Sequence, residues 1–271
     1  RRASETLGRA ERERIIRLVA SSVGEACDRA SPIVSAELPG SGERFEGILP
    51  PVSESPCFAI RKPAGQPIAL DTYVETGALT PALCVGLRQA LEDRLNIVVA
   101  GGTSSGKTTF ANALLSEPAL SEDRIVILED TRELRCSAED VTQLRTHRSG
   151  ITLRDLVRST MRLRPDRIIV GEVRGGEALD LLKAWNTGHP GGITTLHANS
   201  ASGALTRLEQ LVEEATTALP HALIGEAVDV IVFMSRASGA RRVEQALRIT
   251  GFDGTEYRPE PLAAPFLNIV N

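Results

Sequence analysis

Residues 96–115 read Asn-Ile-Val-Val-Ala-Gly-Gly-Thr-Ser-Ser-Gly-Lys-Thr-Thr-Phe-Ala-Asn-Ala-Leu-Leu. An apolar run at 96–100 is followed by a loop rich in glycine and then by helix-forming residues. Four positions fit the pattern G-x-x-x-x-G-K-[ST], which is typical of phosphate-binding loops: Gly101, Gly106, Lys107 and Thr108. The stretch therefore predicts a strand, a phosphate-binding loop and a helix, in that order.

The chemistry of this loop depends on its backbone as well as its side chains. Glycines let N–H groups turn inward around an anion, and the N-terminus of the following helix adds positive potential. Lys107 can reach the β- and γ-phosphates of a nucleotide, and the Thr108 hydroxyl can ligate Mg²⁺. A plain glycine turn, the alternative, does not explain why these two residues stand where they do. The residues expected to bind the nucleotide are Gly101, Gly102, Thr103, Ser104, Ser105, Gly106, Lys107, Thr108 and Thr109.

The composition is that of a globular protein. Among 271 residues, 42% are hydrophobic and 24% are charged, enough for a large core and one or two domains. The net charge of −4 and the aromatic content of 3% argue against a strongly basic DNA-binding protein and against a stacking platform for single strands. No apolar run approaches the roughly 18 residues of a membrane span. Four cysteines without C-x-x-C spacing favour reduced thiols in the cytoplasm and argue against a zinc site.

The first 80 residues differ from the rest. Residues 4–30 carry apolar side chains at helical spacing among Arg and Glu, which predicts one amphipathic helix. The chain is then rich in Pro, Gly and Ser up to position 67, with β-like pieces at 45–49 and 57–61. We therefore expect a small α+β domain at 1–67 and a linker at 68–80.

From residue 81 onward, strand-like and helix-like segments alternate. Apolar strands are predicted at 96–100, 125–129, 167–171, 193–197 and 228–234. Helices are predicted at 81–91, 107–116, 152–163, 176–186 and 201–214. Residues 243–257 alternate around a Gly turn and predict a β-hairpin. Apolar strands that alternate with helices favour an α/β fold with a mostly parallel sheet covered on both faces.

Acidic residues follow two of these strands, where an open α/β sheet places its ligands. After the strand at 125–129 stand Glu129, Asp130 and Glu133, which can hold Mg²⁺ or its water molecules. A charged loop that caps the next element is the alternative for this cluster.

The strand at 167–171 runs directly into Glu172. In the Walker B pattern, an apolar strand ends in an acidic residue that orders Mg²⁺ or polarises the attacking water. Here the acid is Glu and a glycine precedes it, which suits general-base or water-positioning work better than direct coordination. We expect Glu172 to be catalytic, against the alternative of a solvated carboxylate at a strand end.

A third polar segment is Thr187-Gly-His-Pro-Gly-Gly-Ile-Thr-Thr-Leu-His-Ala-Asn199, in which a Gly/Pro turn leads into a strand that ends at His197. A histidine in that place can sense the γ-phosphate or relay a protein movement, although lone histidines are more often structural. His189 is the weaker candidate of the two.

Four segments together resemble the Walker A, Asp box, Walker B and His box of the secretion ATPases: 101–109, 129–134, 162–178 and 187–199. That superfamily spans type II and type IV secretion, conjugation and type IV pilus motors. Residues 180–192 and 207–211 are most similar to the conjugal-transfer ATPases of the type IV secretion branch. The resemblance is specific from about residue 43 to 235 and weak at both ends.

The resemblance implies a RecA-like P-loop ATPase domain at 81–271, preceded by a PAS-like N-terminal domain, in a homohexameric ring. About 65 residues before the linker are few for that N-terminal domain, so we expect part of it to be absent. It also implies that ATP and Mg²⁺ bind between the two domains. Arg44 and Arg61 match the N-terminal-domain arginines that contact nucleotide phosphates, where a guanidinium can neutralise charge on the transferring phosphoryl group.

The remaining implied roles fall on the acidic and histidine boxes. Asp130 joins Thr108 in ordering Mg²⁺, Glu133 assists the catalytic glutamate, and His189 and His197 occupy the His box. One departure is Ser104-Ser105, where Gly-Ser is common in the family. Serine should be tolerated there if its backbone angles are ordinary, and we do not expect it to inactivate the loop.

The sequence thus favours an ATPase that powers a conjugative type IV secretion apparatus. We expect a cytoplasmic protein that associates peripherally with the inner membrane through other components of that machine, without membrane insertion or direct nucleic-acid binding. The alternatives are a pilus-assembly or type II secretion ATPase, a RecA-like nucleic-acid motor and a non-hydrolytic nucleotide switch. The acidic charge argues against the nucleic-acid motor, and intact Lys107, Thr108 and Glu172 argue against the switch.

Overall fold

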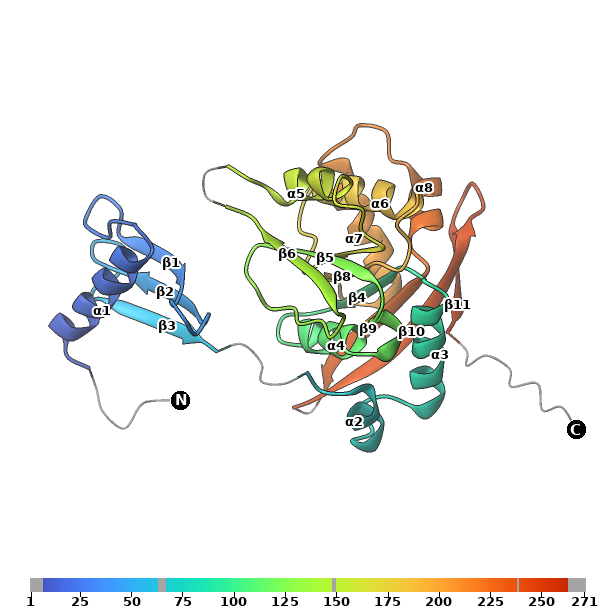
Figure 1. Cartoon of the computed structure of the whole chain (residues 1–271), viewed down its shortest axis with the longest axis horizontal. Coiled ribbons are helices and arrows are strands. Elements are labelled where there is room, and N and C mark those ends of the chain that lie inside the picture. The colour runs from blue at the N-terminus through green and yellow to red at the C-terminus, as the bar shows by residue number, and fades with distance from the viewer. Residues whose placement is uncertain (1–6, 63–66, 148–149, 238, 263–271) are drawn as a thin grey trace, which may run out of the picture. The chain divides into compact units, whose positions relative to one another are not determined.

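The computed structural model describes residues 7–62, 67–147, 150–237 and 239–262. The chain divides into two compact units, Arg1–Gly65 and Gln66–Asn271. In Figure 1 the first unit is blue to light blue, and the second runs from cyan to red. Each unit has its own hydrophobic core and is described by itself.

The first unit consists, in its described part, of one helix on a three-stranded antiparallel sheet. Its elements are α1 (Arg9–Ser22), β1 (Ile33–Glu37), β2 (Arg44–Ile48) and β3 (Cys57–Arg61), with strand order β1-β2-β3. Ile16 and Ala20 on α1 pack with Val34 and Phe45 in the core. Gly47 allows this close packing, because a Cβ at that position would lie 3.0 Å from Ile16 Cγ1.

The helix expected over 4–30 is shorter than predicted. Residues 4–6 lie outside the described residues, α1 begins at Arg9, and it ends at Ser22. Gly24 follows with φ of +74°, a left-handed conformation that stops a helix. The two β-like pieces are confirmed as β2 and β3, whereas β1 was not predicted because Ser35 and Glu37 interrupt its apolar pattern.

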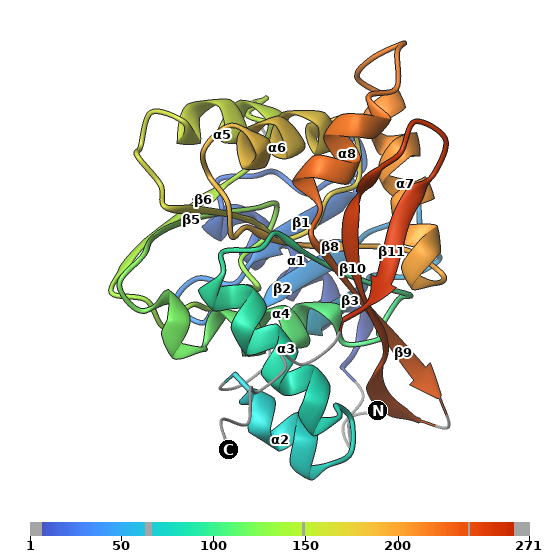
Figure 2. The same ribbon diagram turned by 90° about the vertical axis from the view of Figure 1, so that its right-hand side faces the viewer.

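The second unit is a sheet with helices on both faces (Figure 2). Over the residues that the structure describes, the strand order is β11-β10-β9-β4-β8-β7-β5-β6. The strands from β9 to β6 in that order are parallel, and β10 and β11 add an antiparallel edge. Their bounds are β4 (Ile97–Gly101), β5 (Arg124–Glu129), β6 (Asp140–Arg145), β7 (Arg167–Val170), β8 (Ile193–Leu196), β9 (Val230–Ala237), β10 (Ala240–Phe252) and β11 (Tyr257–Pro261).

The helices of the second unit are α2 (Leu70–Glu75), α3 (Pro81–Glu92), α4 (Lys107–Leu115), α5 (Leu153–Thr160), α6 (Glu177–Asn186), α7 (Ala201–Glu213) and α8 (His221–Ala227). A 3₁₀ turn at Pro118–Leu120 follows α4. Among the described helices of the whole chain, none is both long and apolar enough to cross a membrane.

Side chains of the central strands alternate between two cores. On β4, Val98 and Ala100 pack in the cluster that includes residues of α5 to α8. Ile97 and Val99 pack in the other cluster, with residues of α3 and α4. The predicted α/β fold with a mostly parallel sheet covered on both faces is therefore confirmed.

The five predicted strands and the five predicted helices of this unit are present, with small differences at their ends. The predicted hairpin at 243–257 is also present, but β10 begins earlier, at Ala240, and also pairs with β9. The segment 68–80, expected as a linker, contains α2, whose Tyr73 is buried with its ring edge-on to Phe110 at 5.2 Å between centroids. β6 was missed because its polar, half-exposed sequence lacks a continuous apolar run.

Polar side chains close the amino ends of the parallel strands. Arg167 starts β7 and is only 1% exposed. Its Nε donates to Asp123 Oδ2 at 2.5 Å, and its Nη2 donates to the Leu91 carbonyl at 2.9 Å. Asn96, just before β4, accepts at Oδ1 from the Gly192 amide at 2.9 Å. The first two bonds connect the start of β7 with α3 and with the segment before β5, and the third connects the segments before β4 and β8.

Candidate functional site

The phosphate loop lies between β4 and α4, as the sequence predicts. Gly101 ends β4 and Lys107 starts α4. A Cβ on Gly101 would lie 2.4 Å from the Met234 carbonyl oxygen, and Gly106 has a φ of +100°. Both positions therefore need glycine, which allows the chain to pass close to β9 and turn tightly into the helix.

Ser104 does not have the ordinary backbone angles under which serine was expected to be tolerated. Its φ is +61°, in the left-handed region that costs an L residue about 1–2 kcal/mol. The condition of ordinary backbone angles is therefore not met, and the serine occupies a conformation that glycine adopts without strain. That this residue does not inactivate the loop stays a prediction.

Lys107 points back into the loop. Its side chain is buried, and its Nζ donates to the carbonyls of Gly101 at 3.0 Å and Gly102 at 3.1 Å. Burial lowers the pKa of Lys107 below its usual value, and the nearby Glu172 charge opposes that shift. The ammonium group is thus placed where a phosphate bound in the loop would meet it.

His197 follows β8 and lies between the lysine and the catalytic candidate. Its Nδ1 is 3.4 Å from Lys107 Nζ, and its Nε2 is 2.9 Å from Glu172 Oε1. Partial burial, and then the Lys107 charge, lower the pKa of His197. A neutral imidazole fits the lysine, because its Nδ1 can accept from the ammonium group, whereas the approach of Nε2 to Glu172 Oε1 is a close contact without hydrogen-bond alignment.

Arg174 is a further charged residue of this site, which the sequence analysis did not identify. Its Nε donates to Glu172 Oε2 at 2.8 Å, and its Nη2 contacts the same oxygen. Its Nη1 lies 3.7 Å from Asp130 Oδ2. The guanidinium therefore ties the carboxylate after β7 to one after β5. The available signal was its place two residues after Glu172, since such residues face the same side of an extended segment.

The acidic residues after β5 have different surroundings. Glu129 is 4% exposed, and its Oε1 accepts from the backbone amides of Glu133 and Leu134 at 2.9 Å each. A carboxylate with these partners orders the loop that follows β5. Asn112 on α4, also missed, donates to the Glu133 carbonyl at 3.1 Å and accepts from the Arg135 amide at 2.9 Å. The helix that starts at the phosphate loop is therefore joined directly to the acidic loop.

The residues of the loop fit a polyphosphate ligand. Ser105 Oγ is buried and has no hydrogen-bond partner among the described residues, so a donor in the loop remains to be satisfied. Together with Lys107 and the helix N-terminus, it presents donors at one place. We therefore find the loop suited to a nucleotide's phosphates.

The proposed Mg²⁺ ligands are Thr108 on α4 and Asp130. Asp130 is partly exposed, and its Oδ1 accepts from Thr146 Oγ1 at 3.1 Å. Within the described part of the chain, no group of three His, Cys, Asp or Glu side chains could hold a metal ion by itself. Mg²⁺ commonly takes one or two protein oxygens and completes its shell with phosphates and water, which matches this sparse ligand set.

Three further candidates are Arg44, Arg61 and His189. Arg44 pairs with Arg61 across β2 and β3, so both project from one face of the sheet in the first unit. His189 precedes β8, and its Nδ1 is 2.9 Å from the Pro165 carbonyl oxygen. The structure thus places His189 near the start of that strand and His197 after its end, and does not bring the two together.

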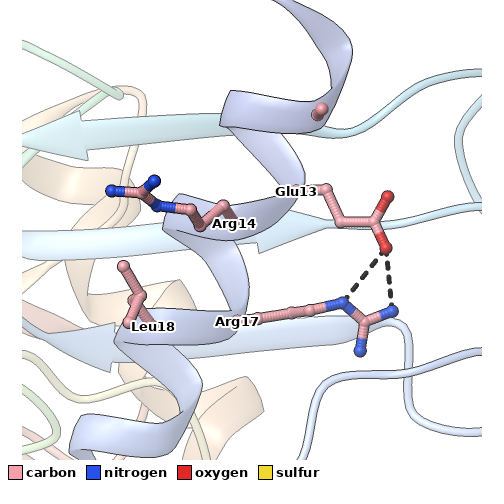
Figure 3. A pocket seen from close by; sticks show the side chains of 5 residues that line it. Glu13, Arg14, Arg17 and Leu18 are labelled. Atoms are coloured by element: carbon pink, nitrogen blue, oxygen red, sulfur yellow. Dashed lines mark hydrogen bonds and ion pairs between the residues drawn. The ribbon is translucent and has the colours of Figure 1, made fainter.

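A surface pocket lies on α1 of the first unit (Figure 3). It is lined by Ala10, Glu13, Arg14, Arg17 and Leu18. Glu13 and Arg17 form an exposed ion pair one helical turn apart, at 2.9 Å. This pocket contains none of the residues expected in the nucleotide site.

Comparison with known proteins identifies the family of this chain. The family model described as type II/IV secretion system protein matches residues 18–247. The chain is 51% identical over 253 residues to the conjugal transfer protein TrbB of Rhizobium radiobacter, which covers 93% of this chain and 78% of that protein.

Two solved structures extend the comparison to the fold. The VirB11 ATPase of the Brucella suis type IV secretion system, in complex with sulphate, is 30% identical with a TM-score of 0.57, over 87% of this chain and 80% of that one. The Legionella pneumophila ATPase DotB has a TM-score of 0.61 at 21% identity, over 91% of this chain and 70% of that one. The second unit therefore has the RecA-like fold that the sequence predicts.

Proposed function

The chain belongs to the type II/IV secretion system protein family, and we propose that it is an ATPase that powers a conjugative type IV secretion apparatus. The observation that carries the proposal is the series of contacts from Lys107 through His197 to Glu172. These residues follow β4, β8 and β7, which are neighbours in the sheet. A cation suited to phosphate is thereby connected to a carboxylate suited to act on water.

ATP binds through the phosphate loop in this proposal. The backbone N–H groups of Gly101 to Thr109 surround the phosphates, Lys107 contacts the β- and γ-phosphates, and Ser105 Oγ supplies a further donor. Thr108 and Asp130 hold Mg²⁺, which when bound neutralises charge on the phosphate oxygens.

Glu172 acts on the water that attacks the γ-phosphorus. As the new P–O bond forms, the bond to the β–γ bridging oxygen breaks, the water proton passes to the carboxylate, and ADP and phosphate leave. His197 and Arg174 contact the two oxygens of Glu172 and so orient the carboxylate. Glu133 assists, held near the site by the contacts of its backbone with Glu129 and Asn112.

Arg44 and Arg61 are the proposed contribution of the first unit. Their direct pairing across β2 and β3 directs both side chains to one face of that sheet. In this proposal a nucleotide phosphate replaces the present partners of these arginines, since charge on a transferring phosphoryl group is stabilised by arginine. Movement of the first unit would then follow the state of the nucleotide.

The assembly proposed is a homohexameric ring in the cytoplasm, bound peripherally to inner-membrane components of a conjugation machine. The family membership and the TrbB and VirB11 relatives support this assignment. The net charge of −4 favours protein partners over direct nucleic-acid binding.

The decisive experiment compares the wild type with Glu172→Gln, using Glu213→Gln on the exposed end of α7 as the matched control. We expect Glu172→Gln to reduce steady-state ATP hydrolysis at least about a hundredfold while nucleotide binding persists, and the control to hydrolyse normally. Light scattering with Mg-ATP should give about six times 29.0 kDa. Undiminished hydrolysis in Glu172→Gln would refute the catalytic assignment.

DNA transfer by cells that carry the same two variants tests the transport role. Loss of transfer with Glu172→Gln and normal transfer with Glu213→Gln is the expected result. Normal transfer by a variant that no longer hydrolyses ATP would refute the proposal that this chain powers the apparatus.

A further inference from the structure

The hairpin of β9 and β10 extends past the edge of the sheet beside the phosphate loop. Gly101, the last residue of β4, pairs with Met234 in β9. β9 continues to Ala237, and β10 returns with Arg241 opposite Arg236. The end of the hairpin therefore lies beyond the carboxyl end of β4, where the loop begins.

Strand alternation decides which side chains of the hairpin face the loop. Met234, Arg236 and Arg241 share one face, whereas Arg242 belongs to the other. Met234 identifies the face on the loop side, because its Cε is 3.7 Å from the position of a Cβ on Gly106. Arg241 is therefore directed to the loop, and its sequence neighbour Arg242 is directed away from it.

Arg241 contacts the loop at two points. Its Nε donates to the Ser104 carbonyl oxygen at 3.1 Å. Its Cδ lies against Gly106, only 2.9 Å from where a Cβ would be. The guanidinium thus binds the carbonyl of the residue that has the left-handed backbone, and the side-chain stem covers the glycine that precedes Lys107.

We infer that Arg241 is a positioning residue of the phosphate loop. The carbonyl of Ser104 and the amide of Ser105 belong to one planar trans peptide, so they point in opposite directions. Fixing the carbonyl toward Arg241 therefore fixes the Ser105 N–H on the opposite side, where it is 3.3 Å from the Gly102 carbonyl within the loop. The arginine holds the loop in its anion-binding form before the ligand arrives.

The hairpin face also responds to the ligand. Arg236 and Arg241 are directly opposite each other, and like charges in that position repel. An anion in the adjoining loop reduces this repulsion. Since the proposed anion is the polyphosphate of ATP, this inference rests on the proposed function for its ligand, although the positioning of the loop itself does not.

The test compares Arg241→Ala with Arg242→Ala, which removes the same charge from the neighbouring, outward-facing position. In protein without added nucleotide, we expect faster amide hydrogen exchange in residues 102–106 for Arg241→Ala only. With nucleotide, we expect its Kd for ADP and its KM for ATP to rise about tenfold, as for loss of one charge-assisted hydrogen bond, while kcat changes less than about twofold. Arg241→Lys, which keeps a donor and a charge, should show a smaller rise.

The outcomes separate this inference from the proposed function. If the wild type hydrolyses ATP and Arg241→Ala matches it in exchange, Kd and KM, only the role of Arg241 is refuted. If Arg242→Ala shows the same changes, the effect is one of general charge and the role is also refuted. If loop exchange rises in Arg241→Ala but the wild type neither binds nor hydrolyses ATP, the positioning contact stands and the proposed function fails. An unfolding temperature close to that of the wild type, expected for this exposed side chain, confirms that the variants are folded.

Discussion

Charged side chains lie at both ends of the parallel strands, but they are buried at the amino ends and accessible to solvent at the carboxyl ends. At the amino ends, Arg167 and Asp123 are 1% and 7% exposed and bind each other. At the carboxyl ends, the side chains of His197 and Arg174 are 49% and 57% exposed around a Glu172 that is 18% exposed. One sheet thus carries an ionic network with a buried centre at one end, which the half-exposed Arg94 joins through Asp123, and an accessible network at the other end.

The difference shows that the same types of charged residue stabilise the fold where they are buried and are available for chemistry where they are exposed. Arg167 also donates to the Leu91 carbonyl, so its geometry is determined by the packing of several segments. A buried charge with such partners cannot exchange them without disrupting the fold. The charges around Glu172 meet solvent, and each can exchange its present partner for a phosphate, a metal ion or a water molecule.

The largest effect is expected from a substitution in the accessible network at the carboxyl ends of the strands. Lys107→Met should lower the rate of ATP hydrolysis on the order of a thousandfold, because the charged donor to the phosphates is lost from a protected site. The melting temperature of this variant should not fall. Burial lowers the pKa of Lys107, which reflects the cost of desolvating its charge, and the substitution removes that cost. Steady-state kinetics and thermal unfolding check both parts. Hydrolysis within tenfold of the wild type would contradict the proposed role of this end.

The second-largest effect is expected from a substitution in the buried network at the amino ends of the strands. Arg167→Met leaves the buried Asp123 with Arg94 as its remaining ion-pair partner and should reduce the free energy of unfolding by about 3 kcal/mol. For a unit of this size, that loss corresponds to a fall of about 6–12 °C in Tm.

The control for this change is Arg158→Met, which removes an exposed arginine paired with Asp180 at 3.0 Å. It should cost at most about 1 kcal/mol. Denaturant unfolding measures both variants, and the Kd for ADP of the folded Arg167→Met protein should equal that of the wild type. Equal losses of stability in the two variants would show that the amino-end network is no different from a surface ion pair.

A smaller effect is expected at Ser104. Glycine relieves about 1–2 kcal/mol of left-handed strain but adds about 0.5–1 kcal/mol of backbone entropy to the unfolded chain. Ser104→Gly should therefore stabilise the second unit by about 0.5 kcal/mol without loss of hydrolysis. Ser116→Gly in the αR conformation after α4 is the control and should destabilise the unit. A less stable Ser104→Gly protein would mean that the serine side chain contributes something that the backbone does not reveal.

The smallest effect concerns pH. The pKa of His197 is lowered in the folded protein, so between that pKa and the ordinary value near 6.5 the unfolded chain binds more protons. The stability contributed by neutral His197 is therefore complete above about pH 6.5 and is lost as the pH falls through the folded pKa. His197→Gln should flatten this part of the curve of unfolding free energy against pH. His189→Gln serves as the comparison, because His189 contacts the carbonyl oxygen of Pro165 and does not contact Lys107 or Glu172 in the described network. Identical curves for the wild type and His197→Gln would contradict this reading of the site.

Much of the candidate site could be predicted because its residues follow strands that end at one edge of a parallel sheet. Lys107, Glu172 and His197 are far apart in the chain, yet Glu172 and His197 stand at the ends of apolar runs and Lys107 follows one after the glycine-rich loop. Arg174 and Asn112 were missed because a charged residue in a loop and an amide in a helix are ordinary surface features until their partners are known.

The sequence by itself determined the phosphate loop, the parallel sheet and the edge at which polar residues gather, because glycine spacing, apolar runs and helix signals act over a few residues. Only the tertiary structure decided which charges meet. Arg241 reaches Ser104 across 137 positions of the chain, and Arg167 reaches Asp123 across 44. These contacts arise from strand order and register, which depend on packing over the whole sheet and leave no local signature. The left-handed backbone of Ser104 has the same origin, since surrounding contacts hold it against its own preference.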